Sequence, residues 1–573
     1  MTIILGIEGT AWNLSAAIVN EDDVIAESTR TYKPAAGGIH PREAAQHHAA
    51  HVGEVIDELF RAFEEKGYSR SDIDAVAFSK GPGLGPCLRI VGTAARMVSL
   101  MLEKPLVGVN HCVAHIEVGL WKTDATDPIT LYVSGANSQV LAYEENEPGI
   151  GAYRVFGETL DIGLGNSLDK FARSAGLPHP GGPLVEKYAK EATEYIELPY
   201  TVKGMDFFFS GLSTAATRAL KEKSNPNKNN IDETLANVCY SYQETAFAMA
   251  VEVTERALAH TGKNEVLLAG GVGANSRIRE MLEQMCADRG AKFFVPEKKF
   301  MGDNGAMIAY TGLLMFKAGD TLSVEESYVD AGFRPDEVKV SWKEEKQKNR
   351  AEEIKKMQNG AEAVVHAELK SYGFEKEFGV AANDQNQPEM VVKERIQKNY
   401  RLPQIDSKLR KERTRTEVRM LTEARRCGIT VPVIYGVSDY AIKMEQIQGL
   451  PLKFVIDENE TIAEEVGKTI GKLHANNIIH GDLTTSNMIY KQTPDSDAKL
   501  YLIDFGLSFS ENSVEAKGVD IHVLFQTFDS SHKNPEKLKD LFAAGYRKSY
   551  KEADSILKRA EEIKMRGRYI EGK

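Results

Sequence analysis

The stretch ILGIEGTAWNLSAAIV, residues 4–19, places a glycine turn with small polar residues between two short apolar runs. Both runs have the length and the apolar composition of buried strands. The stretch ITLYVSGANSQVLAY, residues 129–143, repeats this order of strand, glycine turn and strand. The repeat predicts two similar α/β halves that face each other in the first part of the chain.

Two glycine-rich turns fit the same arrangement. KGPGLGPCLRIVGTAAR, residues 80–96, and LLAGGVGANSRIREML, residues 267–282, each follow a strand and open a helix. Backbone N–H groups and the helix dipole can bind phosphate there, although one such turn alone can be mere tight packing. Two of them in a repeated domain favour a duplicated ribonuclease-H-like architecture that holds its ligand between the halves.

The segment NHCVAHIEVGL, residues 110–120, places His111 and His115 one helical turn apart. Side chains at this spacing project from one face of a helix and can share a metal ion. A zinc protease carries a glutamate after the first histidine, in H-E-x-x-H, but Cys112 stands here. The pair alone is weak evidence, and a third ligand must come from elsewhere in the chain.

Composition describes an ordinary soluble protein. The chain has 573 residues, 42% hydrophobic and 27% charged, which is too long for one core and predicts two or three domains. No apolar run approaches about twenty residues, and the start lacks the basic region of a signal peptide. We therefore expect a cytoplasmic protein with no membrane contact. Five scattered cysteines predict neither a disulfide framework nor a zinc ribbon.

Charge is unevenly distributed along the chain. The net charge of -12 argues against binding nucleic acid over the whole surface. Residues 393–426, however, hold twelve Lys and Arg against five Asp and Glu. This segment could face a polyanion, or it could be a helix with a solvated charged face.

We divide the chain into residues 1–330, a charged linker at 331–350, and a second domain at 351–573. In IIHGDLTTSNMIY the order of Asp482 and Asn487, followed by Asp504 in LIDFGLS, matches H-R-D-x-x-x-x-N and D-F-G of protein kinases. Asp482 would orient the attacking hydroxyl, while Asn487 and Asp504 would hold Mg²⁺ against the phosphates of ATP. Gly481 replaces the arginine of that motif.

The rest of the kinase pattern is reduced. Lys393 in MVVKERI is placed to pair with the nucleotide phosphates, and Glu417 is its candidate partner. Gly360 and Ala361 occupy the place of the glycine-rich loop, but G-x-G-x-x-G is missing, so we expect a different grip on ATP. No A-P-E follows Asp504. A small bilobal α+β kinase-like domain that transfers or hydrolyses phosphate is expected, with no support for a peptide substrate.

The motifs together carry a resemblance. Residues 1–325 resemble the universal tRNA threonylcarbamoyladenosine transferase family, once called O-sialoglycoprotein endopeptidase, of the actin-like ATPase fold, through GIEGTA, KGPGLGPCLRIVG, NHCVAHIE, LYVSGANSQ, GETLDIGLGNSLDKFAR, FSGLST, GGVGANSR and GDNGAMIA. The second domain resembles the small RIO-like kinase of the KEOPS complex, through VVKERI, HGDLTTSN, DFGLSF and MRGR. The order of the two domains is similar to that in archaeal fusion proteins.

The resemblance implies a reaction and a site. His111, His115 and Asp303, with Tyr132 as a further ligand in the archaeal branch, would bind Fe²⁺ or another divalent metal. The substrate would be threonylcarbamoyl-adenylate, and the acceptor the adenosine that follows the anticodon in tRNAs reading codons that begin with A. The implied substrate-binding residues are Tyr132, Val133, Ser134, Gly135, Ala136, Asp169, Gly182, Glu186 and Asn275. No residue stands out as the base for the acceptor amine.

The same resemblance implies that the second domain is an ATPase and an atypical serine/threonine kinase that supports the cycle of tRNA modification. Expected partners are tRNA and the small KEOPS subunits, one dimerising on the transferase and another binding the kinase. Residues 393–426, Lys564, Arg566 and Arg568 become candidate tRNA contacts.

Three alternatives stay open at this point. A metalloprotease is suggested by the old family name, and a small-molecule kinase by the duplicated hairpins of the actin-like fold. In the third, the kinase-like domain is a scaffold that binds nucleotide without catalysis. The absence of H-E-x-x-H argues against the first, and the intact Asp482, Asn487 and Asp504 argue against the last.

Overall fold

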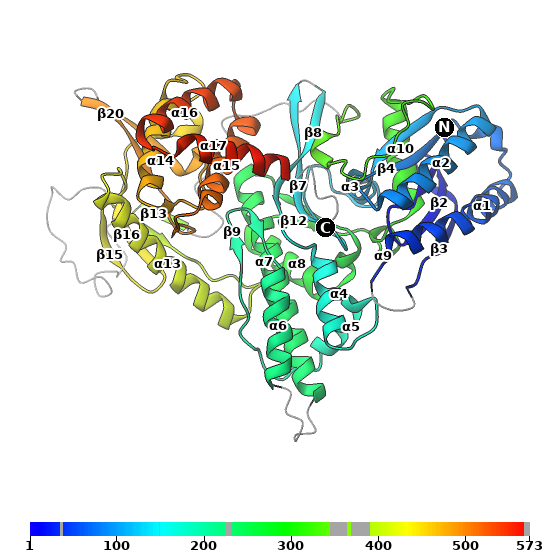
Figure 1. Ribbon diagram of the computed structural model, residues 1–573, viewed down its shortest axis with the longest axis horizontal. Helices are drawn as coiled ribbons and strands as arrows, with labels where there is room; N and C mark the ends of the chain where they lie inside the picture. The colour runs from blue at the N-terminus through cyan, green and yellow to red at the C-terminus, as the bar shows by residue number, and fades with distance from the viewer. Residues whose placement is uncertain are drawn as a thin grey trace. The chain divides into compact units, whose positions relative to one another are not determined.

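The computed structural model describes residues 1–34, 38–147, 149–223, 231–343, 364–367, 390–493 and 496–566 (Figure 1). These residues form two compact units. The first comprises 1–343 together with Asn399–Arg401, and the second comprises the described residues of 364–398 and 402–566. Among the described residues, no helix is long and apolar enough to cross a membrane.

The first unit begins with a five-stranded sheet in the order β3-β2-β1-β4-β5. β1 and β3 pair antiparallel with β2, whereas β4 pairs parallel with β1, and β5 parallel with β4. The hairpin predicted from residues 4–19 is therefore confirmed. The strands are β1 (Ile4–Glu8), β2 (Asn13–Val19), β3 (Val24–Thr31), β4 (Ala75–Gly81) and β5 (Leu106–Asn110).

Alternation along β1 places helices on both faces of this sheet. Leu5 and Ile7 lie in one core with α1 (Pro41–Glu65) and α2 (Gly85–Leu102). Ile4 lies in a second core with α3 (His111–Trp121) and α10 (Gly305–Lys317). Successive side chains of a strand point to opposite faces, so every residue of β1 is buried. A Cβ at Gly6 would lie 2.3 Å from the backbone nitrogen of Ala309, so glycine lets α10 approach the strand.

A second five-stranded sheet has the order β8-β7-β6-β11-β12. Strand for strand, its order and its antiparallel and parallel pairings match those of the first sheet. Its largest core cluster joins the sheet to the helices that follow it. The strands are β6 (Ile129–Val133), β7 (Ser138–Glu147), β8 (Ile150–Glu158), β11 (Glu265–Ala269) and β12 (Lys292–Phe294). The helices are α4 (Leu164–Ser174), α5 (Gly181–Ala189), α6 (Ser210–Lys223), α7 (Ile231–Thr261), α8 (Ser276–Arg289) and α9 (Lys298–Met301).

Residues 331–343 pack within the first unit, although the charge pattern predicts a linker from residue 331. Val338 and Val340 are buried, and Val340 pairs with Gly151 as an isolated β-bridge. Trp342 donates a hydrogen bond from Nε1 to Glu117 Oε1, 3.0 Å away on α3. Val338, Val340 and Trp342 alternate with charged and polar residues, so the segment has the charge pattern of a linker although every second side chain packs inward.

The second unit combines an antiparallel sheet, β13-β14-β16-β15, with a helical part. Ile462, Val466, Ile470 and Leu473 recur at helical spacing and form the buried face of α14. The sheet consists of β13 (Val364–Ala367), β14 (Met390–Glu394), β15 (Ile434–Val437) and β16 (Ala441–Glu445). The other elements are α13 (Pro403–Arg426), α14 (Ile462–Ala475), β17 (Leu450–Pro451), β18 (Ile478–Ile479), β19 (Met488–Thr493), β20 (Ser496–Leu502), β21 (Phe509–Ser510), α15 (Val514–Ser531), α16 (Pro535–Ser549) and α17 (Ala553–Arg566).

Candidate metal centre and kinase-type site

The two predicted histidines lie in the first turns of α3. Asn110 ends β5 and caps the helix, because its Oδ1 accepts hydrogen bonds from the backbone N–H groups of Cys112 (3.0 Å) and Val113 (3.1 Å). His111 is thus the first helical residue, and His115 follows one turn later. Their ring centroids are 4.8 Å apart, and both side chains are buried. The end of β5 and the Asn110 cap together fix the position and direction of the His111 and His115 side chains.

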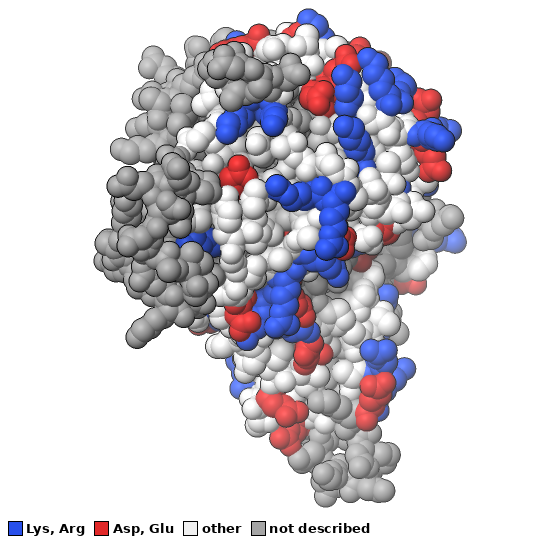
Figure 2. Space-filling model, turned by 90° about the vertical axis from the view of Figure 1, so that its left-hand side faces the viewer, with Lys and Arg blue, Asp and Glu red and all other residues white. Residues whose placement is uncertain are grey.

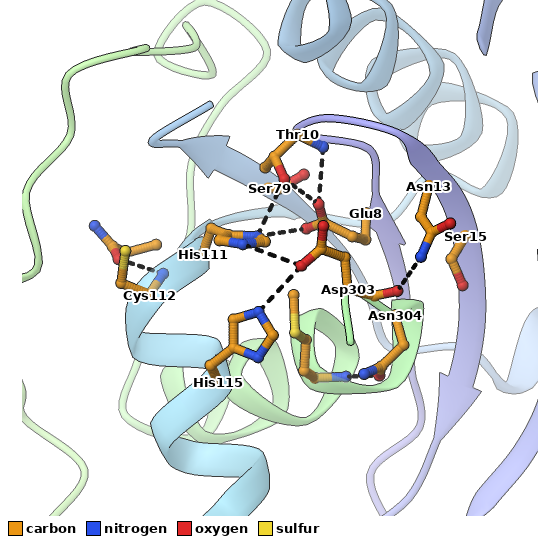
Figure 3. A network of polar contacts seen from close by, with 12 residues as sticks. Glu8, Thr10, Asn13, Ser15, Ser79, His111, Cys112, His115, Asp303 and Asn304 are labelled. Carbon is orange, nitrogen blue, oxygen red and sulfur yellow. Dashed lines mark hydrogen bonds and ion pairs between the residues drawn. The ribbon is translucent and has the colours of Figure 1, made fainter. Parts of the chain in front are cut away.

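Asp303, on the loop before α10, joins the two imidazoles from a distant part of the sequence (Figure 3). Its Oδ1 lies 3.2 Å from Nε2 of His115 and 3.5 Å from Nε2 of His111. One ligand atom from each of the three side chains lies within 4.8 Å of the others. Two imidazole nitrogens and a carboxylate oxygen are a donor set that suits a divalent transition metal.

Charges at this centre shift each other's pKa. Burial lowers the pKa of His111, but the carboxylates of Glu8 and Asp303 outweigh it and raise this pKa to about 9. For His115, burial and the charge of His111 lower the pKa. Despite burial, the hydrogen bond to His115 and the charge of His111 lower the pKa of Asp303. Its surroundings therefore favour the carboxylate form of Asp303, the form that binds a cation.

Tyr132 of β6 lies beside His115, with ring centroids 5.1 Å apart. Its hydroxyl is buried and has no hydrogen-bond partner among the described residues, and the same holds for Nδ1 of His115. A buried hydroxyl without a partner is costly, and a bound group would satisfy it. The residues present therefore fit a metal ion held by His111, His115 and Asp303, with Tyr132 adjacent.

Sequence reasoning missed the polar residues of the β1–β2 hairpin. Glu8 contacts His111, and Asn13 Nδ2 donates to the backbone oxygen of Asp303 (3.1 Å). Ser15 Oγ accepts from the backbone N–H of Gly305 (3.0 Å). The charged Glu8 and the polar Thr10, Asn13 and Ser15, in an otherwise apolar hairpin, are the signal that could have revealed them.

Two of the predicted substrate-binding residues, Glu186 and Asn275, lie at the start of α8, and two more, Asp169 and Gly182, lie where α4 meets α5. Oε1 of Glu186 on α5 accepts from Ser276, both from its backbone N–H (3.1 Å) and from its hydroxyl (2.6 Å). Asn275 caps α8 through the backbone N–H of Arg277 (2.8 Å). Asp169 on α4 accepts from the backbone N–H of Gly181 (2.7 Å), next to Gly182. A Cβ at Gly182 would meet nothing within 4 Å, so the space beside it is open.

The predicted loop Val133–Ala136 is packed against two glycines. A Cβ at Gly163 would lie 2.2 Å from the backbone oxygen of Ala136, and one at Gly270 would lie 2.4 Å from that of Val133. The backbone N–H of Gly165 donates to the oxygen of Ser134 (3.1 Å), beside Gly135. These glycines bring the loop onto the start of α4 and onto the second glycine-rich turn.

In the second unit, Lys393 lies on β14 and its candidate partner Glu417 lies on α13. Lys393 Nζ is 2.7 Å from Glu417 Oε1 and 2.6 Å from Asp504 Oδ1. Burial opposes the charged lysine, but these two carboxylates outweigh it and raise the pKa of Lys393. A second cation, Arg395, contacts the other oxygen of Glu417 at 2.6 Å. The structure therefore brings Lys393, Glu417 and Asp504 together.

Asn487 is joined to Asp482, because its Nδ2 donates to the carboxylate Oδ2 and to the backbone oxygen of Asp482, each at 2.9 Å. Gly481 has φ +79°, and a Cβ there would lie 2.3 Å from the oxygen of Leu507. This explains why glycine stands where kinases carry arginine. Gly360 and Ala361 lie outside the described residues.

Comparison with known proteins assigns both units. The family model for TsaD, tRNA N6-adenosine threonylcarbamoyltransferase, matches residues 23–310. The chain belongs to the tRNA N6-adenosine threonylcarbamoyltransferase family. A model for the RIO domain matches residues 383–540, so this transferase carries a RIO-type kinase domain in the same chain. The resemblance of both parts is thereby confirmed.

Two of the relatives below match this transferase over both of its domains. A Methanosarcina barkeri protein named probable bifunctional tRNA threonylcarbamoyladenosine biosynthesis protein is 57% identical over 99% of both chains. A Methanocaldococcus jannaschii protein of the same name is 46% identical over 99% of this chain and all of its own. A Methanococcoides burtonii tRNA N6-adenosine threonylcarbamoyltransferase is 68% identical but covers 60% of this chain and 98% of its own. These matches leave the metalloprotease and metabolite-kinase alternatives without support.

Proposed function

We propose that the first unit transfers the threonylcarbamoyl group from threonylcarbamoyl-adenylate to the adenosine following the anticodon, in tRNAs that read codons beginning with A. The observation that carries this proposal is the convergence of His111, His115 and Asp303 in a chain of the transferase family. The two sheets of equal strand order would be the halves of a duplicated ribonuclease-H-like fold of the actin-like ATPase type. The substrate would lie between them.

His111, His115 and Asp303 would hold one Fe²⁺ or another divalent metal, with Tyr132 as a further ligand. When bound, the metal supplies Lewis-acid polarisation of the threonylcarbamoyl carbonyl. The orphaned hydroxyl of Tyr132 and the ionised Asp303 support this assignment.

The adenylate would be bound by residues 132–136 together with Asp169, Gly182, Glu186 and Asn275. The N-terminus of α8 supports this placement, because Asn275 and Glu186, two of the proposed ligand-binding residues, meet there. The open space beside Gly182 leaves room for the ribose or base. Asp169 and Glu186 would orient the ligand by accepting hydrogen bonds.

The second unit would be an ATPase and an atypical serine/threonine kinase that supports turnover. Asp482 would orient the attacking hydroxyl, and Asn487 and Asp504 would hold Mg²⁺ at the phosphates of ATP. The contact of Lys393 with Glu417 supports this role, because kinases position phosphate through that pair. Gly360 and Ala361 would contribute the loop over the nucleotide.

Transfer RNA would contact the basic residues of segment 393–426 and the C-terminal residues Lys564, Arg566 and Arg568, of which Arg568 lies outside the described residues. Lys408, Arg415 and Arg419 are exposed on α13. On the face drawn in Figure 2, a run of Lys and Arg side chains passes down the middle of the surface, with Asp and Glu side chains beside it. Clustered cations of this kind support binding to a phosphate backbone in spite of the acidic net charge.

The chain would act in the cytoplasm within the KEOPS complex, with one small subunit on each unit. Met97, Leu100 and Met101 support a subunit contact on the transferase, because they are exposed on one face of α2. Exposed apolar side chains three and four residues apart are typical of a helix that packs on a partner. This face is therefore where we place the subunit that dimerises on the transferase.

The proposal is tested by incubating the metal-loaded chain with tRNA, the small subunits and an enzyme that generates threonylcarbamoyl-adenylate, then measuring modified adenosine by mass spectrometry. We expect modification by the wild type and none above background by Asp303→Ala. Modification at the wild-type rate by Asp303→Ala would contradict the proposed metal site. Cleavage of a glycoprotein without modification of tRNA would overturn the proposed function itself.

A further inference from the structure

Glu8 is an acidic side chain buried in the core of the first unit. It is the last residue of β1, and its exposed fraction is 0%. Carboxylates are rarely buried to this extent unless hydrogen bonds or charges compensate them. The contacts of the Glu8 carboxylate therefore indicate its role in the structure.

Both carboxylate oxygens of Glu8 are occupied (Figure 3). Oε1 accepts from Thr10 twice, from the backbone N–H at 2.8 Å and from the hydroxyl at 2.6 Å. Oε2 lies 3.1 Å from Nδ1 of His111, and the hydroxyl oxygen of Thr10 lies 3.3 Å from the same nitrogen. The Gly9–Thr10 turn thus holds the carboxylate in one orientation against the back of the His111 ring.

The two nitrogens of His111 consequently face different partners. Nδ1 faces Glu8, whereas Nε2 faces Asp303 at 3.5 Å. A carboxylate only accepts hydrogen bonds, so it stabilises the imidazole form that carries its proton on Nδ1. In that form the lone pair on Nε2 is directed toward His115 and Asp303.

We propose that Glu8, held by Thr10, is a positioning residue that keeps the proton of His111 on Nδ1 and so presents Nε2 as the metal ligand. This inference rests on the proposed metal site and adds a supporting residue to it. Outer carboxylates of this kind fix the tautomer and the ring orientation of ligating histidines and increase their basicity.

The two histidines differ in whether a neighbouring group binds their Nδ1 atom. Nδ1 of His115 has no hydrogen-bond partner among the described residues, so no comparable group fixes its tautomer. His111 is therefore the ligand whose geometry the protein sets in advance. The same hairpin also holds the Asp303 loop, through Asn13 and Ser15. Residues 8–15 thus organise two of the three proposed ligands.

Glu8→Gln keeps the shape of the side chain but removes its negative charge and one of its two acceptor oxygens. The backbone N–H of Thr10 can only donate, so the amide oxygen must face Thr10 and the amide nitrogen must face His111. The amide nitrogen is a donor, which favours the proton on Nε2 and blocks that atom as a ligand. We expect the affinity for Co²⁺, measured by its visible absorption bands, to fall about 10- to 100-fold.

Glu117→Gln is the matched control. Glu117 is also a buried glutamate, on the same helix as the histidines, and it accepts hydrogen bonds from Tyr153 (2.7 Å) and Trp342 (3.0 Å). This change disturbs packing without touching the proposed ligands. We expect the Co²⁺ affinity of Glu117→Gln to stay within about twofold of that of the wild type. This holds even if the thermal unfolding midpoint of the metal-free protein falls by as much as in Glu8→Gln.

The outcomes separate this inference from the proposed function. Absence of Co²⁺ binding to the wild type would overturn the metal site and this inference with it. Equal affinity of wild type and a folded Glu8→Gln would overturn the inference alone, as would an equal loss in Glu117→Gln. If Glu8→Gln fails to fold, a crystal structure of the wild type with Zn²⁺ decides. Zinc on Nε2 of His111, with Nδ1 against Glu8, is expected, and zinc on Nδ1 or on Glu8 itself would contradict it.

Discussion

Single side chains at the candidate metal centre are tied to one another by charge. Asp303 is one of the two carboxylates that raise the pKa of His111, and its own pKa is lowered by its contact with His115. A change at one residue therefore alters the protonation of the others. This coupling makes the centre sensitive to isosteric substitutions that leave the packing intact.

Asp303→Asn should remove metal binding without unfolding the first unit. The amide keeps the shape of the side chain but loses the anionic oxygen, so we expect the affinity for Co²⁺ to fall at least about 100-fold. Equilibrium dialysis measures the loss, with Glu297→Gln as an exposed acidic control. Retention of metal by Asp303→Asn would show that the carboxylate is not a ligand.

Lys393→Met should abolish ATP hydrolysis in a second unit that stays folded. Glu417 keeps Arg395 as a partner at 2.6 Å, so removal of Lys393 does not leave this carboxylate without a cation. We expect the ATPase rate to fall at least about 100-fold, with the thermal unfolding midpoint close to that of the wild type. An unchanged rate in the folded variant would exclude a kinase-type role for this lysine.

Elements of the first unit differ in how readily their sequences reveal them. The β1–β2 hairpin and the helix carrying His111 follow from alternation and spacing within a few residues. The packing of residues 331–343 does not, because Val338 and Val340 depend on β8 and α3, which lie far away in sequence. Local patterns predict elements, whereas tertiary partners decide where an element ends.

The candidate site shows the same division between residues that local patterns predict and residues that only the fold brings together. Spacing identified the pair His111 and His115, and the resemblance supplied Asp303, whose loop only the fold brings near. Glu8 escaped notice because a lone glutamate in an apolar strand has no distinctive spacing. Its role depends on a contact with a residue that comes 103 positions later.

The contact between β8 and β10 (Asp206–Phe207) predicts a pH dependence of stability. Burial and the charge of Glu158 raise the pKa of Asp206 to about 7. Because the folded pKa exceeds the unfolded one, this group stabilises the fold fully below pH about 4, and the contribution is lost as the pH rises through 7.

Asp206→Asn should remove that dependence, since asparagine stays neutral and can still accept from the backbone N–H of Glu158. We expect the free energy of unfolding of the wild type, relative to the variant, to fall by about 3 kcal/mol between pH 4.5 and 8. Urea titrations followed by tryptophan fluorescence measure the first unit alone, because Trp12, Trp121 and Trp342 all belong to it. Parallel curves for the two proteins would contradict the prediction.

The whole molecule combines an acidic net charge with local basic surface. Arg415→Glu with Arg419→Glu should weaken tRNA binding and lower the slope of log Kd against log salt by about two, because each arginine would no longer neutralise a phosphate. Arg218→Glu with Lys221→Glu, exposed on α6, changes the net charge equally and serves as the control. Equal weakening in both double variants would indicate a net-charge effect instead of a binding surface.

The central claim is that one unit transfers the group while the other supports turnover. The most direct test compares wild type, His111→Ala and Asp482→Ala in a reaction with tRNA, threonylcarbamoyl-adenylate, ATP and the small subunits, first with enzyme in excess and then with tRNA in excess. We predict no product from His111→Ala under either condition, and a single round but no multiple turnover from Asp482→Ala. Multiple turnover by His111→Ala, or by Asp482→Ala at the wild-type rate, would contradict the claim.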